Sequence, residues 1–359
     1  MPRIELLGVS KRFGKIAALR NVTFTVEDGQ YVCVLGSTGA GKTTLLKVIA
    51  GILRPEKGLV KIDGKVVNNV PPELRGVGYF PQTYALFPHL KAWENVAYPL
   101  FISGVDRETA RDRSLEILRL VGLEARPDSY PHEFSGGMKQ RLALARALAS
   151  DAKILLLDEP LGALDAILAL ELRYELRKIA RKLGLTVIHV THNQEEALSI
   201  ADKLIILRRG TVVFEGSPKE AYENPPSLYV ANFIGEMNFF RGFCYEENSG
   251  CVVETEEGLV FHSAYPPPSR RVVLAFRPDR ILLGRGETNV FEGTVKSVSI
   301  SGAIVRYEVS VPPATIVIKT IARGTILQPN SGVIFSVPPR DVLVFPYPRR
   351  GLMAALEVE

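Results

Sequence analysis

Several features are scarce in this sequence, and each scarcity argues against a class of protein. No stretch of about eighteen uncharged apolar residues occurs, so the sequence predicts no transmembrane helix. The opening residues, MPRIELLG, lack the apolar core of a signal peptide, and we therefore expect a cytoplasmic protein. The three cysteines are an odd number, which argues against a disulfide framework.

Length and composition set broader limits. A chain of 359 residues suits two or three domains better than one. The hydrophobic fraction of 46% and the charged fraction of 23% are those of an ordinary globular protein. The net charge of +5 is mild, and it is compatible with ATP or with an anionic membrane surface without requiring either.

Residues 36–43 read GSTGAGKT and match the phosphate-binding pattern G-x-x-x-x-G-K-[ST]. The apolar run YVCVL before them predicts a buried strand, and TTLLKVIAG after them predicts a helix. In that context the glycines let backbone N–H groups point at phosphate oxygens, and the helix start adds positive potential. We expect Lys42 on the β and γ phosphates and the Thr43 hydroxyl on Mg²⁺. The predicted ATP-binding residues here are Gly36, Ser37, Thr38, Gly39, Ala40, Gly41, Lys42, Thr43 and Thr44.

Two carboxylates end another apolar run, KILLLDEP at 153–160. In the same chain as a phosphate-binding loop, this pattern predicts that Asp158 holds Mg²⁺ and that Glu159 orients or deprotonates the attacking water. Successive strand residues point to opposite sides, which suits such a division of roles. A plain Asp-Glu-Pro turn is the alternative.

Three further polar sites fit the same order along the chain. His192 follows the apolar run LTVIHVT, and it could polarise the γ phosphate or hold the water and Glu159 in line; a structural histidine is the alternative. Gln82 ends VGYFPQ and is a candidate for contacting Mg²⁺ or water and for sensing the nucleotide. The Ser-Gly-Gly segment Ser135–Gly137 opens a predicted helix, where backbone N–H groups can face an anion.

Strand and helix patterns alternate from residue 31 to 207, which predicts an α/β fold with a mostly parallel sheet and a helical subdomain at about 84–150. Near residue 235 the sequence pattern changes, and short strand-like runs separated by Gly and Pro follow as far as 345. Their spacing predicts a small β-barrel or sandwich. We therefore expect domains at 1–238 and 239–359.

In this order, the motifs resemble those of the ATP-binding cassette (ABC) subunits of importers, over about residues 3–240. The matching motifs are an aromatic A-loop at Phe13, Walker A at 36–43, the Q-loop at Gln82, the signature at 134–138, Walker B at 154–158 followed by Glu159, the D-loop at 161–165 ending in Asp165, and the H-loop at His192. The signature reads FSGGM where the family usually has LSGGQ, and the D-loop reads GALD where SALD is usual.

The resemblance implies how ATP and the partners bind. Phe13 would stack on adenine, although a loop anchor is the plainer interpretation of that residue. A head-to-tail homodimer would hold each ATP between Walker A of one subunit and the signature residues Ser135, Gly136 and Gly137 of the other. The region Pro88–Tyr98 would dock a coupling helix of an integral membrane permease, with a solute-binding protein as an indirect partner. This resemblance places the chain peripherally at the cytoplasmic face of the membrane and implies no nucleic-acid partner.

The C-terminal region, about 241–359, looks like the OB-type (TOBE-like) barrel that follows the cassette in sugar, polyamine, iron and oxyanion importers. The segment FRPDRILLG (Phe276–Gly284) looks like the recurring Arg-Pro-acidic segment of that domain. In the family, the domain serves dimer contacts and regulation. The run KSVSISGAIVRYEV could line a ligand pocket, but core strands are the favoured interpretation.

The leading hypothesis is therefore an ATPase subunit that couples ATP hydrolysis to the import of a small solute, with sugar, polyamine, iron and oxyanion all open. One alternative is a soluble, non-transport ABC ATPase, but the chain has no long coiled-coil insertion and no second cassette. Another is a ligand-sensing regulatory protein that uses the C-terminal barrel, and the intact Glu159 and His192 argue against it.

Cys244 and Cys251 flank the segment 245–250, and a turn centred on Glu247–Asn248 would place them opposite each other on paired strands. We expect free thiols, because an ordinary cytoplasm keeps cysteines reduced, although a bridge is less unusual in a hyperthermophile.

Overall fold

The computed structural model describes residues 2–150, 152–162, 166–247, 250–322 and 326–357. They form two compact units, one reaching to Lys219 and the other beginning at Glu220. None of the helices within these ranges is long and apolar enough to cross a bilayer.

A six-stranded sheet forms the centre of the first unit, in the order β10-β9-β3-β8-β7-β6. The five strands from β9 to β6 run parallel, and only the edge strand β10 is antiparallel. Every residue of β3, β7 and β8 is buried, which is why these strands read as continuous apolar runs. The expected α/β fold with a mostly parallel sheet is thus confirmed. The strands are β3 (Tyr31–Leu35), β6 (Val77–Phe80), β7 (Ile154–Asp158), β8 (Thr186–Thr191), β9 (Lys203–Arg208) and β10 (Thr211–Gly216).

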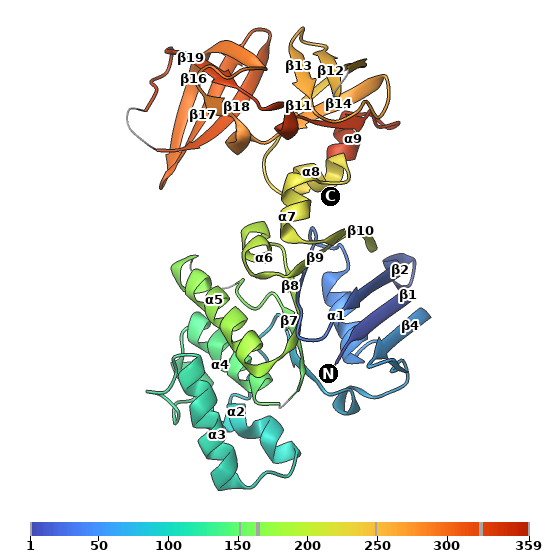
Figure 1. Cartoon of the computed structure of the whole chain (residues 1–359). Helices are drawn as coiled ribbons and strands as arrows, with labels where there is room; N and C mark the ends of the chain where they lie inside the picture. The colour runs from blue at the N-terminus through green and yellow to red at the C-terminus, as the bar shows by residue number, and fades with distance from the viewer. Residues whose placement is uncertain (1, 151, 163–165, 248–249, 323–325, 358–359) are drawn as a thin grey trace. The chain divides into compact units, whose positions relative to one another are not determined.

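A second, antiparallel sheet has the order β2-β1-β4-β5. A hairpin turn joins β4 to β5, with positive φ at Asp63 and Gly64 as such tight turns require. Helix α1 lies between this sheet and the parallel sheet, and its apolar side chains join both in one core (Figure 1). The bounds are β1 (Ile4–Phe13), β2 (Ile16–Val26), β4 (Lys57–Ile62), β5 (Lys65–Val66) and α1 (Lys42–Ala50).

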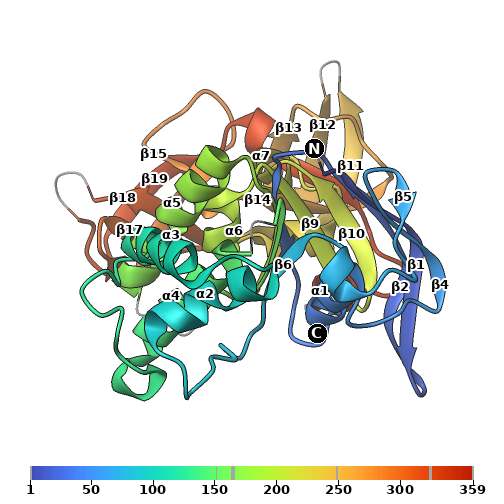
Figure 2. The ribbon, with the colours of Figure 1, turned by 90° about the horizontal axis from the view of Figure 1, so that it is seen from below.

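Helices cover the opposite face of the parallel sheet and form a separate group beside it (Figures 1 and 2). α6 contacts β3 and β8, and α5 lies against α6. α2, α3 and α4 contact one another and make the expected helical subdomain. The bounds are α2 (Ala92–Ile102), α3 (Arg107–Leu120), α4 (Gly136–Leu148), α5 (Ala166–Leu183) and α6 (Gln194–Ile200), with short 3-10 turns at η1 (Pro72–Leu74) and η2 (Pro131–Glu133).

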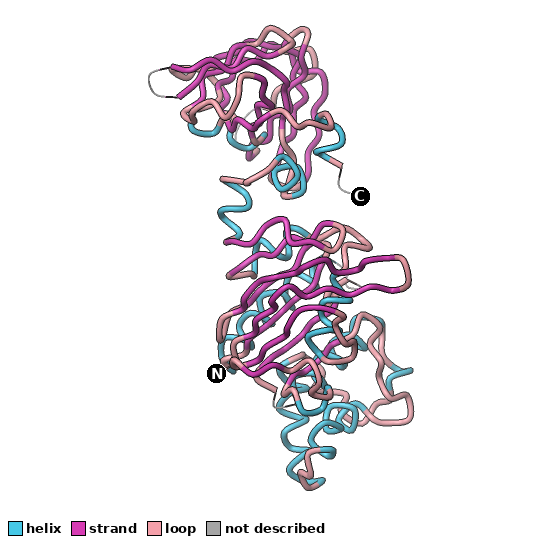
Figure 3. The backbone as a smooth tube through the Cα atoms, turned by 90° about the vertical axis from the view of Figure 1, so that its right-hand side faces the viewer, coloured by secondary structure: helices cyan, strands magenta, loops and turns pink. Residues whose placement is uncertain are grey.

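The second unit consists mainly of strands (Figure 3). Two antiparallel five-stranded sheets, β13-β12-β11-β14-β20 and β15-β19-β16-β17-β18, share one core, which confirms the expected all-β region. Its elements are α7 (Pro218–Glu223), α8 (Leu228–Phe233), β11 (Asn238–Glu247), β12 (Gly250–Thr255), β13 (Val260–Ser263), β14 (Arg271–Phe276), η3 (Pro278–Arg280), β15 (Leu282–Leu283), β16 (Val290–Ser301), β17 (Ile304–Val311), β18 (Ala314–Ile321), β19 (Gly332–Ser336), η4 (Pro339–Asp341), β20 (Leu343–Pro346) and α9 (Leu352–Leu356).

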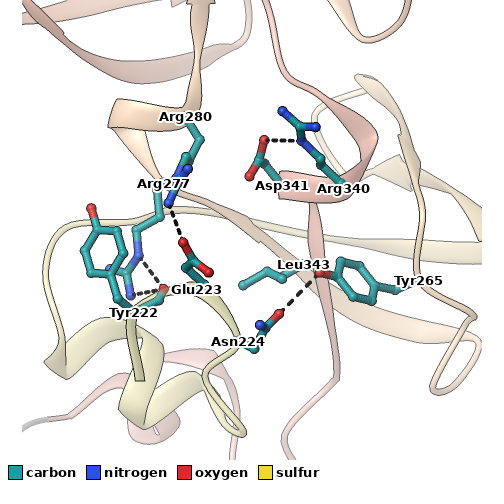
Figure 4. Close-up of a pocket in the computed structure, with 9 residues that line it drawn as sticks. All are labelled: Tyr222, Glu223, Asn224, Tyr265, Arg277, Arg280, Arg340, Asp341 and Leu343. Carbon is teal, nitrogen blue, oxygen red and sulfur yellow. Dashed lines mark hydrogen bonds and ion pairs between the residues drawn. The ribbon is translucent and has the colours of Figure 1, made fainter. Parts of the chain in front are cut away.

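Arg277, from the segment that resembles the recurring family motif, ties α7 and α8 to these strands. Its buried guanidinium donates hydrogen bonds to the carbonyl oxygens of Tyr222 and Ala231. Its Cζ lies 4.2 Å from the centroid of the Tyr222 ring, and Figure 4 shows the two side chains together. Leu228 of α8 is buried in a cluster with Phe345 of β20. The division between units therefore precedes α8, whereas the sequence placed the boundary at residue 238.

The two C-terminal cysteines are free thiols in this structure, and the strand register around them differs from the prediction. Cys244 is directly opposite Val253, and Cys251 is directly opposite Glu246, so that the two cysteines lie diagonally across the hairpin. The expected turn was centred on Glu247–Asn248, and Asn248 lies outside the described ranges. Burial, and then the contact with Cys251, raises the pKa of Cys244 to about 12, so this thiol stays protonated at neutral pH.

The division of units predicts how truncated chains behave. A chain ending at Lys219 should fold and bind ATP, because its core is complete. A chain ending at Asn238 should bind a hydrophobic dye such as ANS more strongly, because it carries α8 without the strands that bury it. ATP titration and dye fluorescence measure these outcomes. Loss of ATP binding in the shorter chain alone would show that α7 and α8 belong with the first unit.

Candidate functional site

The phosphate-binding loop joins β3 to α1, and close packing explains two of its glycines. A β-carbon at Gly36 would lie 2.6 Å from the carbonyl oxygen of Leu207, and one at Gly41 would lie 2.3 Å from that of Ala18. Gly41 also has a φ of 101°, a conformation that side chains disfavour. The loop therefore bends tightly against β2 and β9, as the motif predicts.

Lys42 begins α1, and its side chain folds back over the loop. The ammonium donates hydrogen bonds to the carbonyl oxygens of Gly36 (2.7 Å) and Ser37 (2.9 Å). Burial lowers the pKa of Lys42, while the carboxylates of Glu159 and Asp158 act to raise it. The lysine charge is thus held between the loop and the two carboxylates at the end of β7.

The side chains of Thr43 and Asp158 meet at the same end of the sheet as Lys42. The Thr43 hydroxyl donates to Oδ1 of Asp158 at 3.1 Å, and the Tyr79 hydroxyl donates to Oδ2 at 3.4 Å. Burial raises the pKa of Asp158, and these hydrogen bonds only partly offset it. Among the described residues there is no group of three or more His, Cys, Asp or Glu side chains that could hold a metal ion by themselves. One carboxylate beside one hydroxyl fits Mg²⁺, which takes few protein ligands and completes its shell with phosphate and water oxygens.

Glu159 lies at the centre of the remaining predicted residues. Nε2 of Gln82 donates to its Oε2 at 3.2 Å, and Nδ1 of His192 lies 3.2 Å from its Oε1. The backbone of Glu159 has a φ of 50°, and its N–H donates to the carbonyl oxygen of Val190 at 2.9 Å. A left-handed conformation in a non-glycine residue stores strain, and such strain is concentrated at functional sites. The side chains of Gln82 and His192 thus both contact the Glu159 carboxylate, one at each oxygen.

These residues come together because β3, β6, β7 and β8 are parallel neighbours in one sheet. Residues that follow parallel strands meet at the same edge, which is where ligands bind in open α/β sheets. The structure thus brings together the loop 36–43, Gln82, Asp158, Glu159 and His192.

Other predicted residues lie outside this group. Phe13 is half exposed at the end of β1, where its described neighbour is the ammonium of Lys11 at 5.7 Å. Ser135 caps α4, and its hydroxyl accepts a hydrogen bond from the Met138 N–H at 3.3 Å. Asp165 lies outside the described residues. Tyr79 was missed from the sequence, although its place beside β7 in a short strand before Gln82 is a usable signal.

Comparison with known proteins agrees with this site and with the second unit. A family model described as "ABC transporter" matches residues 19–162, and one described as "TOBE domain" matches residues 274–345. The chain is 41% identical over 305 residues to the Fe(3+) ions import ATP-binding protein FbpC of Brucella abortus (strain 2308), which covers 84% of this chain and 86% of that protein. It is 43% identical over 292 residues to the spermidine/putrescine import ATP-binding protein PotA of Haemophilus influenzae (strain ATCC 51907 / DSM 11121 / KW20 / Rd), which covers 80% and 78% respectively.

The chain belongs to the ATP-binding subunits of ABC importers. The dimeric structure of the bacterial ABC transporter cassette MJ0796 is 34% identical to it, with a TM-score of 0.56, and covers 60% of this chain and 98% of that one. The same cassette has been solved in a post-hydrolysis state bound to ADP and Pi, with the same identity and TM-score. This ABC subunit accordingly binds and hydrolyses ATP.

The burial of Asp158 leads to a prediction about stability. Replacing Asp158 by Asn should raise the Tm of the metal-free protein at neutral pH, because it removes a carboxylate that burial disfavours. The cost of that carboxylate is full above its raised folded-state pKa and disappears below its ordinary value of 3.8, so the difference in Tm should shrink as the pH falls.

Calorimetry across a pH series measures this difference. Asp128→Asn is the matched control, since Asp128 is exposed and its described ion pair is with Lys91, and exposed pairs contribute little to stability. A Tm for Asp158→Asn below that of the wild type at every pH would contradict the prediction.

Proposed function

We propose that this ABC subunit drives the import of a small solute by hydrolysing ATP as a head-to-tail homodimer, bound to a permease at the cytoplasmic face of the membrane. The observation that carries the hydrolytic part is the convergence of Gln82 and His192 on Glu159, beside Lys42 and Asp158. A carboxylate held from both sides, next to a phosphate-binding loop, suits an attack by water on the γ phosphate.

Each residue then has a role that follows from its contacts. Lys42 and the loop N–H groups hold the phosphates, and Thr43, Asp158 and Gln82 provide the oxygens for Mg²⁺, which when bound neutralises phosphate charge. Glu159 takes a proton from the attacking water, and His192 orients the carboxylate from its Oε1 side. Gln82 contacts the other carboxylate oxygen of Glu159. A change in the nucleotide bound at the site would therefore shift Gln82 and the loop that follows β6.

A second copy of the chain would complete this site. Gly136 has a φ outside the left-handed region, and a β-carbon there would meet no described residue within 4 Å. Neither the backbone conformation nor packing among the described residues therefore requires glycine at this helix start. The close approach of a phosphate group held by a second subunit would require it, and the related cassette MJ0796 has been solved as a dimer.

Changing Glu159 to Gln should leave ATP binding intact and slow hydrolysis, since general-base catalysis contributes about 10²–10⁴-fold. The variant should then accumulate as an ATP-bound dimer in the presence of Mg²⁺. Size-exclusion chromatography with ATP, together with the turnover rate, tests both points. Only monomer in the eluate, or turnover near the wild-type rate, would contradict the proposed site.

Changing Gly136 to Ala should lower turnover while the Tm and the ATP affinity of the isolated chain stay unchanged. The methyl group meets open space among the described residues of one chain, but it would lie in the gap that a second subunit's ATP must enter. Gly36→Ala is the matched control, because its β-carbon clashes within the chain and should lower both Tm and ATP affinity. Unchanged turnover in Gly136→Ala would argue against the composite site.

The proposed permease contact is a groove between β6 and the helical subdomain, of about 420 Å³. Phe87, Tyr98 and Arg146 line it, and Tyr98 is the last residue of the expected docking region Pro88–Tyr98. Arg146 holds the groove's wall by donating to the carbonyl oxygens of Ala85 (2.8 Å) and Tyr84 (3.2 Å). Tyr79 also lines the groove, and its hydroxyl donates a hydrogen bond to Asp158. A permease helix bound in the groove would therefore be connected to the ATP site through Tyr79.

The relatives favour ferric iron or a polyamine as the imported solute over a sugar or an oxyanion. Specificity should lie in the permease and in a solute-binding protein, because the described site is built for nucleotide. Retention of one of these solutes by the partner binding protein would identify the class. Binding of the solute by this chain alone would instead favour a ligand-sensing role for its C-terminal unit.

A further inference from the structure

Four polar side chains form a buried network on the face of the parallel sheet that α6 covers. Tyr31, His189, Thr191 and Glu196 are each at most 4% exposed. The Tyr31 hydroxyl lies 2.9 Å from Nδ1 of His189, and Nε2 of His189 lies 2.9 Å from Oε1 of Glu196. This second contact has ion-pair distance but departs from the line of a normal hydrogen bond. The Thr191 hydroxyl donates to Oε2 of Glu196 at 2.8 Å.

Thr191 and Glu196, at one end of this network, lie on either side of His192 in the sequence. The Thr191 hydroxyl accepts a hydrogen bond from the Asn193 N–H at 3.0 Å, and the Asn193 side chain accepts one from the Glu196 N–H at 3.0 Å. The residues on both sides of His192 are therefore fixed by the same carboxylate and by the start of α6.

The His192 side chain itself is 61% exposed, and its described contact is with Glu159. With most of its side chain in solvent, the direction of the ring depends strongly on the backbone turn between Thr191 and Asn193. A small shift of that turn would move Nδ1 away from the carboxylate of Glu159, which it reaches at 3.2 Å.

Glu196 keeps its charge despite burial. Burial acts to raise its pKa, but the contacts with His189 and Thr191 and the charge of Arg173 outweigh this effect, so the pKa lies below its ordinary value. An ionised carboxylate has two strong acceptor oxygens. Here Oε2 accepts the hydrogen bond from Thr191, and Oε1 lies at ion-pair distance from His189.

We propose that Thr191 and Glu196 are positioning residues for hydrolysis, which hold the turn carrying His192 so that its ring stays on Glu159. They contact neither Gln82 nor Asp158 in the described structure, and they act through His192 alone. This inference rests on the role that the proposed function gives to His192.

Thr191→Val tests the inference, because it keeps the shape of the side chain and removes the hydroxyl. We expect kcat to fall on the order of tenfold, as small displacements of catalytic groups do, with the KM for ATP unchanged. Thr191→Ser restores the hydroxyl and should bring kcat back to within about twofold of the wild type. Glu196→Gln, which leaves one acceptor oxygen for two contacts, should lower kcat in the same way.

Thr186→Val is the matched control at the other end of β8. Thr186 is fully buried, and its hydroxyl also makes two hydrogen bonds, one to the Pro2 carbonyl oxygen and one from the Gly29 N–H. This substitution should lower the Tm as much as Thr191→Val does, but leave kcat unchanged. Equal losses of kcat in the two variants would mean a general structural effect and would overturn the proposal.

A double-mutant cycle with His192→Ala separates the remaining outcomes. If Thr191 acts through His192, Thr191→Val should cause no further loss of kcat in the His192→Ala background. A full additional loss there would overturn the inference. If His192→Ala lowers kcat but Thr191→Val alone does not, only the positioning role fails. An unchanged kcat in His192→Ala would contradict the proposed role of His192 itself, and the inference with it.

Discussion

The hydrogen bond from the Glu159 N–H to the carbonyl oxygen of Val190 is the constraint on which the hydrolytic end of the site depends. It continues the parallel pairing of β7 with β8 one residue past the last strand pair, Asp158 with Val190. That contact accompanies a left-handed backbone at Glu159, a conformation that costs about 1–3 kcal/mol and persists only when neighbouring structure holds it. The carboxylate is thereby turned to where Gln82 and His192 both reach it.

The two faces of the parallel sheet serve this one edge in different ways. On one face, α1 begins with Lys42 and Thr43 and joins the antiparallel sheet in an apolar core. On the other face, α6 follows His192 directly, and the buried carboxylate of Glu196 ties its first turn back to β8. Buried charges are costly unless they are paired, so this network fixes one arrangement of the turn strongly. The residues proposed to bind phosphate and to activate water are thus supported by separate layers of the fold.

Much of this site could be predicted from local patterns. The loop 36–43 has a distinctive spacing, and apolar runs before Asp158 and His192 predict strands whose ends meet in a parallel sheet. The contact between Gln82 and Glu159 could not be derived in the same way, because it depends on how strands far apart in sequence are ordered. The positive φ at Glu159 also has no sequence signal, since glutamate rarely adopts it.

Other misses have equally specific causes. The diagonal placement of Cys244 and Cys251 depends on the hairpin register, which a shift of one residue would change. The sequence pattern places the helix α8 in the first domain. Its apolar residues pack with the C-terminal strands, however, and Arg277 donates a hydrogen bond to the Ala231 carbonyl oxygen of this helix. The Thr191–Glu196 contact was hidden because a Thr and a Glu beside a predicted catalytic histidine look like ordinary helix-start residues.

The central claim is that one chain holds the phosphate-binding and water-activating groups, while a second copy provides the signature segment that completes the site. The most direct measurement is the specific ATPase activity of the full chain over a wide dilution series at saturating ATP and Mg²⁺. If two copies form each site, specific activity should fall as the protein is diluted below its dimerisation range. A specific activity that stays constant down to concentrations at which the ATP-bound protein sediments as a monomer would contradict the claim.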